Sequence, residues 1–195
     1  IEIKGVKKLR SVDFSIQPDR IEVFTILAAA VASKGEVKVI NCNPQHLQAP
    51  LSKLRDMGVH IKTGRNWIKA TYRFPLQGIK VKTGVYPSFP TDCQQQISAL
   101  MLQSTSPSLL IETIFNSRFK HLEEYRKLGA EIKIENNLAL IEPAILTACS
   151  LEGFDLRGAA SMIIASLMLN EESEVSGLQY LHRGYESFVE KLNYL

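Results

Sequence analysis

The stretch Phe89-Pro90-Thr91-Asp92-Cys93-Gln94-Gln95-Gln96 decides how this chain folds, because it joins a proline turn to an apolar helix. Asp92 is expected to cap that helix by accepting hydrogen bonds from its free N–H groups. Gln95, three residues later, is placed to reach back, as in a capping box. A carboxylate at the positive end of a helix is also suited to accept the proton of a substrate hydroxyl. The stretch therefore has a structural interpretation and a functional one.

The same arrangement occurs three times along the chain. Asp19, Asp92 and Asp155 each precede a helix that is apolar nearly all round, and Asp92 and Asp155 are 63 residues apart. After each apolar helix come a strand and a helix with one apolar stripe, and the first two units then add a hairpin. The expected strands are 1–4, 12–16, 36–40, 59–63, 67–71, 78–83, 108–114, 130–134, 138–141 and 174–180, and the expected helices begin at Asp19, Pro44, Asp92, Arg118, Asp155 and Arg183.

This repeat predicts an α/β fold (α+β in some schemes) built from three βαβαββ units. A helix that is apolar on all sides must be buried on all sides, so the three apolar helices are expected at the centre with the sheets outside. The units span about 11–71, 78–143 and 145–195, and the last is incomplete because its hairpin is missing. The chain also opens on the last strand of a preceding unit. We therefore expect residues 1–195 to be one domain of a longer, two-domain protein.

Composition narrows the function classes. The chain is 45% apolar and 22% charged, with a net charge of +3 and no long basic run, so neither a nucleic-acid partner nor a membrane surface is expected. Three cysteines without short spacing indicate a reducing compartment rather than a disulfide framework. The four histidines are scattered, so no metal site is predicted. The most apolar run, 159–169, is too short to span a membrane.

Arginines recur at the predicted helix starts. Arg118 and Arg183 begin striped helices, and Arg157 follows Asp155. Such arginines are either solvated surface residues or an anion site, and their repetition keeps both interpretations open because cations are disfavoured at helix N-termini and need a reason there. Two weaker candidates remain open. Cys93 is either a thiol of lowered pKa or a small packed residue, and His121 is either a phosphate contact or a surface residue.

Five ordered motifs resemble the enolpyruvyl transferase family, and within it the UDP-N-acetylglucosamine 1-carboxyvinyltransferases. The resemblance extends over the whole chain. The motifs are Pro18-Asp19-Arg20-Ile21-Glu22, Phe89-Pro90-Thr91-Asp92, Glu112-Thr113-Ile114-Phe115-Asn116-Ser117-Arg118-Phe119, Asp155-Leu156-Arg157 and Arg183-Gly184-Tyr185-Glu186.

The resemblance implies two domains, each an inside-out α/β barrel, with the active site between them. This chain would be most of the second domain, and the first domain would be its partner. The implied reaction transfers the enolpyruvyl group of phosphoenolpyruvate to the 3-hydroxyl of UDP-N-acetylglucosamine, in the cytoplasm, for peptidoglycan synthesis and without a cofactor. In the implied roles, Asp92 is the general base, Arg118, Arg157 and Arg183 bind the phosphate and carboxylate, and Ile114, Asp155 and Thr91 line or support the sugar site.

The chain departs from the family pattern at three places. Asn116 stands where the family usually has Glu, Phe24-Thr25 replaces a Gly-Thr pair, and His182 replaces an aspartate. These departures keep two alternatives open. One is a non-catalytic domain for UDP-sugar binding or assembly, and the other is the sister transferase that acts on shikimate 3-phosphate.

Overall fold

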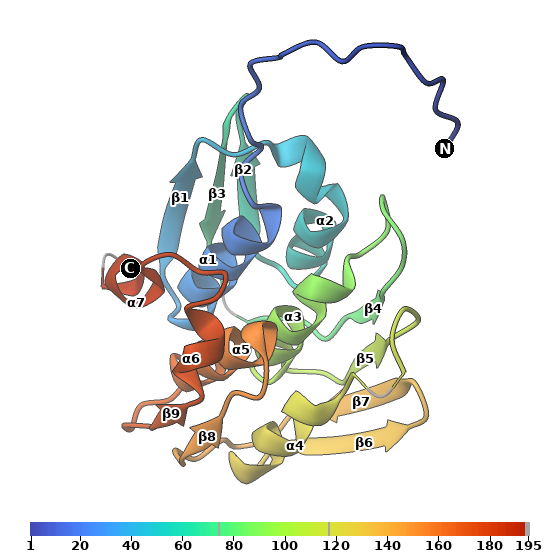
Figure 1. Ribbon diagram of the computed structural model, residues 1–195. Coiled ribbons are helices and arrows are strands. Elements are labelled where there is room, and N and C mark those ends of the chain that lie inside the picture. The colour runs from blue at the N-terminus through green and yellow to red at the C-terminus, as the bar shows by residue number, and fades with distance from the viewer. Residues whose placement is uncertain (74, 117, 194–195) are drawn as a thin grey trace.

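Three helices occupy the centre of the computed structural model, which describes residues 1–73, 75–116 and 118–193. They are α1 (Arg20–Ala32), α3 (Gln94–Met101) and α5 (Leu156–Ser166), and each contacts the other two. The sheets and the remaining helices lie around them (Figure 1). The predicted inside-out arrangement, with helices central and sheets outside, is confirmed.

Burial explains why these three helices are central. All eight residues of α3 are buried, and α1 is buried on every face from Ile21 to Ala32 except at Glu22 and Ile26. The striped helices α2 (Gln48–Asp56) and α4 (Lys120–Lys127) instead bury one side only. A helix with no polar face cannot stand at the surface without exposing apolar area to water.

Three sheets surround the central helices. The first has strand order β1-β3-β2 and is antiparallel, the second has order β4-β5-β7-β6, and the third pairs β8 with β9. In the second sheet β4 runs parallel to β5, with Val81 opposite Leu110, whereas β5 and β7 are antiparallel. The strands are β1 (Glu36–Ile40), β2 (His60–Thr63), β3 (Trp67–Thr71), β4 (Lys80–Lys82), β5 (Ser108–Ile111), β6 (Glu131–Glu135), β7 (Leu138–Glu142), β8 (Leu151–Glu152) and β9 (Val175–Ser176). The second unit is thus a complete βαβαββ unit.

The predicted caps are correct at two of the three helices. Asp19 accepts a hydrogen bond from the Ile21 N–H at 2.8 Å, and Asp155 accepts one from the Gly158 N–H at 2.7 Å. The capping box at Asp92 is wrong. A 3₁₀ turn, η2 (Thr91–Cys93), precedes α3, and neither it nor α3 has a side-chain cap. The Asp92 carboxylate is therefore left for other partners.

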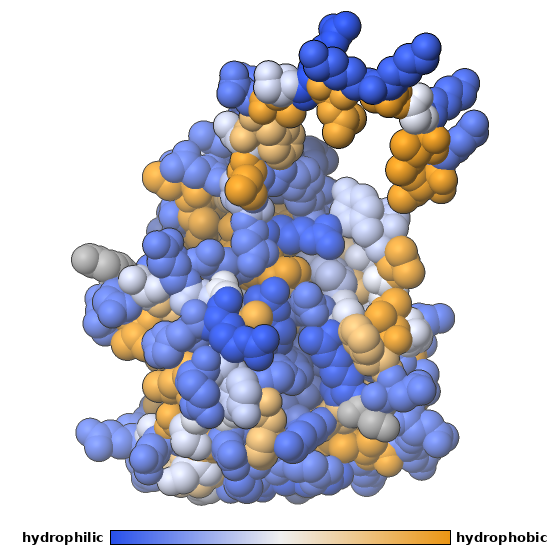
Figure 2. All heavy atoms as spheres, viewed as in Figure 1, coloured by the Kyte–Doolittle hydropathy of each residue, from blue (hydrophilic) through white to orange (hydrophobic). Residues whose placement is uncertain are grey.

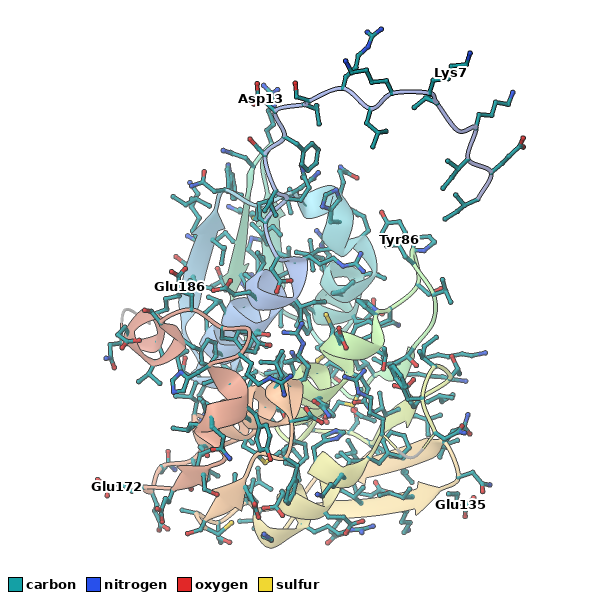
Figure 3. All side chains as sticks on the ribbon, in the orientation of Figure 1. Lys7, Asp13, Tyr86, Glu135, Glu172 and Glu186 are labelled. Carbon is teal, nitrogen blue, oxygen red and sulfur yellow. The ribbon has the colours of Figure 1, made fainter. Side chains whose placement is uncertain are left out.

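The strands predicted at 1–4 and 12–16 are absent. Residues 1–19 are exposed and form no helix or strand. The N-terminal part of this segment extends away from the body in Figure 1, and Figure 3 shows Lys7 and Asp13 on it. Its apolar side chains stand clear of the body in Figure 2. Alternation alone does not make a strand, because a strand needs a neighbour for its backbone hydrogen bonds.

The third unit differs most from its prediction. The strand expected over 174–180 ends at Ser176, because Gly177 adopts a left-handed φ of 79° and turns the chain into α6 (Leu178–Leu181). The helix expected from Arg183 begins later, as α7 (Phe188–Leu192), and β8 was not predicted. Leu195, the last residue of that expected helix, lies outside the described residues.

In the first unit, a 3₁₀ turn, η1 (Pro44–Leu47), precedes α2, and it begins at the proline where the helix was expected to start. No helix of the described residues is both long and apolar enough to cross a membrane.

Candidate active site

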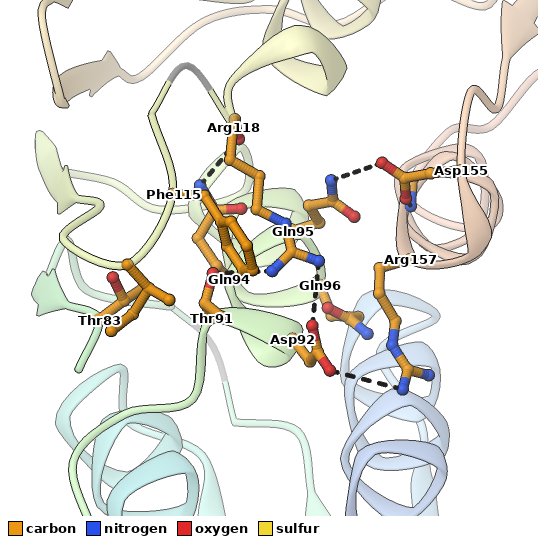
Figure 4. Close-up of polar contacts among 12 residues, drawn as sticks. Thr83, Thr91, Asp92, Gln94, Gln95, Gln96, Phe115, Arg118, Asp155 and Arg157 are labelled. Carbon is orange, nitrogen blue, oxygen red and sulfur yellow. Dashed lines mark hydrogen bonds and ion pairs between the residues drawn. The ribbon is translucent and has the colours of Figure 1, made fainter. Parts of the chain in front are cut away.

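Asp92 lies between two arginines at the start of the central helices (Figure 4). Its Oδ1 accepts a hydrogen bond from Nη2 of Arg118 at 3.0 Å, and its Oδ2 lies 3.8 Å from Nη2 of Arg157. The arginine side chains are largely buried, at 19% and 13% exposure, whereas the Asp92 side chain is 45% exposed. The carboxylate is therefore held on one oxygen, while the other carries no hydrogen bond from the described residues.

Arg118 comes from the loop between β5 and α4, two residues before that helix begins. Its Nη1 donates to the Thr91 hydroxyl at 2.8 Å, and its Cζ lies 5.0 Å from the centre of the Phe115 ring. The guanidinium thus has a hydrogen bond on each of two nitrogens and an aromatic ring against its plane. Ser117, which belongs to the same motif, lies outside the described residues.

Arg157 is in the first turn of α5 and rests on a buried polar cluster. Its Cζ lies 5.3 Å from the centre of the Tyr185 ring, and the Tyr185 hydroxyl is 2.9 Å from the hydroxyl of Thr25. The amide of Gln96 donates to both hydroxyl oxygens, at 3.1 Å to Thr25 and 3.3 Å to Tyr185. Each of the three units contributes one member, so this cluster joins the units beneath Arg157.

Asp155 sits beside the same helix ends. Besides capping α5, its carboxylate accepts a hydrogen bond from Nε2 of Gln95 at 3.4 Å. The starts of α3 and α5 are therefore joined directly, and those of α1 and α3 through Thr25 and Gln96. The three apolar helices therefore begin close to one another.

A hollow of about 380 Å³ opens next to these residues. Its lining includes Arg118, Lys120 and Asp155, together with Gln95, Phe115 and Asn116. Arg118, Arg157 and Lys120 bring three cationic groups to this end of the helices, beside the carboxylates of Asp92 and Asp155. Such a surface favours an anionic ligand.

Two predicted site residues stand apart from this cluster. Arg183 follows α6 and is exposed, and its guanidinium makes no hydrogen bond or ion pair with any residue the structure describes. Ile114 lies in the loop after β5, and its N–H donates to the Glu112 carboxylate at 2.7 Å. That amide is therefore occupied within the chain.

Glu112 is the residue that sequence reasoning missed. The residue is 1% exposed, and its carboxylate accepts hydrogen bonds from the hydroxyls of Thr83 and Thr91, at 2.8 and 2.7 Å. Burial alone would raise the pKa of Glu112, but the hydrogen bonds it accepts, those of Thr91 foremost, hold that pKa below its ordinary value. The available signal was a glutamate directly after the apolar strand Ser108–Ile111, a position where a charge needs partners.

The weaker candidates are resolved by burial. Cys93 is fully buried, and desolvation raises the pKa of its thiol, so the packed interpretation is confirmed. His121 is also buried, so both interpretations of it were wrong. Desolvation lowers the pKa of His121 to about 3, and its Nε2 lies 3.0 Å from the Ser98 hydroxyl.

The departures from the family pattern have different surroundings. Phe24 is fully buried and meets the Phe89 ring edge-on, with ring centres 6.2 Å apart. It therefore supports the stretch that delivers Asp92. Asn116 is exposed at the rim of the hollow, and His182 is exposed after α6.

Comparison with known proteins identifies the family. Residues 1–192 match the family described as EPSP synthase (3-phosphoshikimate 1-carboxyvinyltransferase). This chain belongs to that family. The sequence is 42% identical over 193 residues to the UDP-N-acetylglucosamine 1-carboxyvinyltransferase of Halothermothrix orenii, covering 99% of this chain and 46% of that protein. It is 41% identical over 194 residues to UDP-N-acetylglucosamine 1-carboxyvinyltransferase 2 of Geobacillus kaustophilus, covering 99% and 45%.

Solved structures of the family show the same fold. The enolpyruvyl transferase NikO from Streptomyces tendae matches with a TM-score of 0.84 at 24% identity, covering 94% of this chain and 44% of that one. EPSP synthase from Acinetobacter baumannii matches with a TM-score of 0.63 at 15% identity, covering 84% and 39%. The chain spans less than half the length of the family members it matches.

Proposed function

We propose that the protein containing this chain transfers the enolpyruvyl group of phosphoenolpyruvate to the 3-hydroxyl of UDP-N-acetylglucosamine and releases phosphate. The observation that carries the proposal is Asp92 between Arg118 and Arg157, with a side chain open to solvent and an Oδ2 that accepts no hydrogen bond from the described residues. Both curated relatives compared above bear the name of this activity, at 41 and 42% identity.

The proposed chemistry needs a base and cations beside it. The sugar oxygen bonds to C2 of phosphoenolpyruvate, C3 takes up a proton, and a tetrahedral ketal forms. Loss of phosphate from C2 and of a proton from C3 then restores the vinyl group. The free Oδ2 of Asp92 would accept the hydroxyl proton, and Arg118 and Arg157 would bind the anionic groups.

The remaining predicted residues have supporting roles in this proposal. Thr91 accepts a hydrogen bond from Arg118 and so holds its guanidinium, and Asp155 caps the start of α5. Ile114 borders the sugar site. Arg183 would reach the substrate only with a rearrangement of the segment after α6. A companion domain would supply the opposite wall of the site. Because the proposed substrates are cytoplasmic metabolites, the same proposal implies a cytoplasmic location.

The test is a phosphate-release assay with both substrates, carried out on the whole natural protein that contains this chain. Asp92→Asn keeps the shape of the side chain but removes the base, so kcat should fall about 10²- to 10⁴-fold. Asp56→Asn is the matched control, because Asp56 is an exposed partner of Lys53 and its loss should leave kcat unchanged.

Three outcomes of that assay are informative. Wild-type activity in Asp92→Asn would remove Asp92 from the role of base. Turnover of shikimate 3-phosphate in place of the UDP-sugar would favour the sister transferase. Calorimetric binding of UDP-N-acetylglucosamine without phosphate release would favour the non-catalytic alternative.

A further inference from the structure

The buried carboxylate of Glu112 lies behind the site and has no free oxygen. Four groups donate to it: the hydroxyls of Thr83 and Thr91 and the N–H groups of Ile114 and Phe115, the last at 3.2 Å. All four donors are neutral. A charge on a residue that is 1% exposed is costly to keep, and among the described residues no cation pairs with it, so the four hydrogen bonds stabilise it.

The ionised carboxylate fixes the direction of the Thr91 hydroxyl. A carboxylate only accepts, so the single O–H of Thr91 must donate to Oε2 of Glu112. The lone pairs of the Thr91 oxygen then face Arg118, whose Nη1 donates to it at 2.8 Å. The order of donors therefore runs from Arg118 through Thr91 to Glu112.

Glu112 also positions Arg118 indirectly, through the loop after β5. The N–H groups of Ile114 and Phe115 both donate to Oε1, which holds the turn after β5. The Phe115 ring then lies against the Arg118 guanidinium. Arg118 is thus held at its edge through Thr91 and at its face through Phe115, with Nη2 left for Asp92.

The other two units have no carboxylate at the position that corresponds to Glu112. Glu112 is the first residue after the second strand of its unit, and the corresponding residues after β1 and β9 are Asn41 and Gly177. Asn41 is exposed and Gly177 has no side chain, and both have a positive φ. The turns after β1 and β9 therefore carry no buried charge, and their backbone differs from that at Glu112, which does not have a positive φ.

We infer that Glu112 is a positioning residue of the proposed transferase, which orients the Arg118 guanidinium through Thr91 and Phe115 without touching substrate. This inference rests on the proposed function for its kinetic consequence. In this inference, Glu112 lies behind the site and determines how Arg118 is oriented toward the anionic substrate.

Glu112→Gln tests the inference with little change of shape. The amide oxygen would keep the three donors at Oε1, so the NH₂ group would face Thr91. Thr91 would then accept from the amide, and its O–H would no longer have the carboxylate that fixes its direction. The Arg118–Thr91 hydrogen bond would be weakened, and the KM for phosphoenolpyruvate should rise by up to about tenfold, since one charged hydrogen bond is worth about 1.5 kcal/mol.

Thr91 variants identify the path. Thr91→Val should raise the KM for phosphoenolpyruvate about as much as Glu112→Gln does. Thr91→Ser keeps the hydroxyl, so its KM should stay near that of the wild type. The double variant Glu112→Gln/Thr91→Val should have a KM no higher than that of either single variant. Glu124→Gln is the matched control. Glu124 is also buried, but it pairs with Lys127 and the Glu152 N–H, so its loss should lower stability and leave the KM unchanged.

A measurement without substrate separates this inference from the proposed function. The Nε–Hε NMR signal of Arg118, assigned with Arg118→Lys, should shift or broaden in Glu112→Gln and not in Glu124→Gln. If the wild type releases no phosphate but that signal moves, the proposed function fails and the positioning role stands. An unmoved signal, or losses that multiply in the double variant, would overturn the positioning role.

Discussion

Arg118 shows how one residue can join several contacts at the site. It donates to Thr91 and Asp92 from two different nitrogens and lies against the Phe115 ring. Arg118→Lys keeps the charge, but an ammonium group is a point charge and cannot make these three contacts together. We expect kcat/KM for phosphoenolpyruvate to fall about ten- to a hundredfold.

Steady-state kinetics on the purified protein would check this prediction. Arg55→Lys is the control, because Arg55 is exposed in the last turn of α2 and its side chain makes no hydrogen bond or ion pair with the described residues. A decrease of less than twofold in Arg118→Lys would show that charge alone is enough at this position.

His121 gives a prediction about pH. Burial lowers its pKa in the folded protein to about 3, whereas the unfolded chain has the ordinary value near 6.5. Between these values the unfolded state binds more protons, so the stabilising contribution is present above pH 6.5 and is lost as pH falls toward 3. Lowering the pH from 7 to 5 should cost about 2 kcal/mol of unfolding free energy through this residue.

Urea denaturation at both pH values would measure the His121 effect. His121→Gln binds no proton there, so its unfolding free energy should change less between pH 7 and 5 than that of the wild type. His182→Gln is the control, because His182 is exposed and its removal should leave the pH dependence intact. Equal pH dependence in the wild type and His121→Gln would contradict the assignment.

The central helices carry the stability of the fold. Leu27 of α1 is fully buried, and Leu27→Ala should lower the unfolding free energy by about 2–5 kcal/mol because a cavity forms that the packed helices cannot close. Leu9→Ala makes the same change in the exposed N-terminal segment, where Leu9 is 85% exposed. It should change stability by less than about 0.5 kcal/mol. Chemical denaturation would compare the two, and similar losses would mean that the segment packs in solution.

Element boundaries followed the sequence closely where local signals agreed. In the second unit the apolar helix, the striped helix and the hairpin at Asn136-Asn137 formed as predicted. The strands over 1–4 and 12–16 were wrong because alternation carries no information about a pairing partner. The strand after Glu174 ended early because Gly177 adopts a left-handed backbone conformation. The sequence alone does not show which conformation a glycine adopts.

The whole molecule presents its site on an open face. Asp92 is 45% exposed, and the chain spans less than half of the relatives it matches. Catalysis by a positioned carboxylate and arginines needs oriented substrates and limited water. We expect residues 1–195 alone to release no phosphate from the two substrates, and activity to return when the region equivalent to the remainder of the relatives is supplied. Turnover by the chain alone at the rate of the whole protein would contradict this.

The sequence by itself determined the three apolar helices and the striped helices. It also named seven candidate site residues, of which the structure brings five together: Thr91, Asp92, Arg118, Asp155 and Arg157. These follow from local period and motif order, which a linear chain carries. Only the tertiary structure decided that Asp92 leaves its helix cap to meet two arginines, that Arg183 stands apart, and that Glu112 lies behind Thr91. Those facts depend on contacts between residues distant in sequence, such as the hydrogen bond from Thr91 to the buried carboxylate of Glu112.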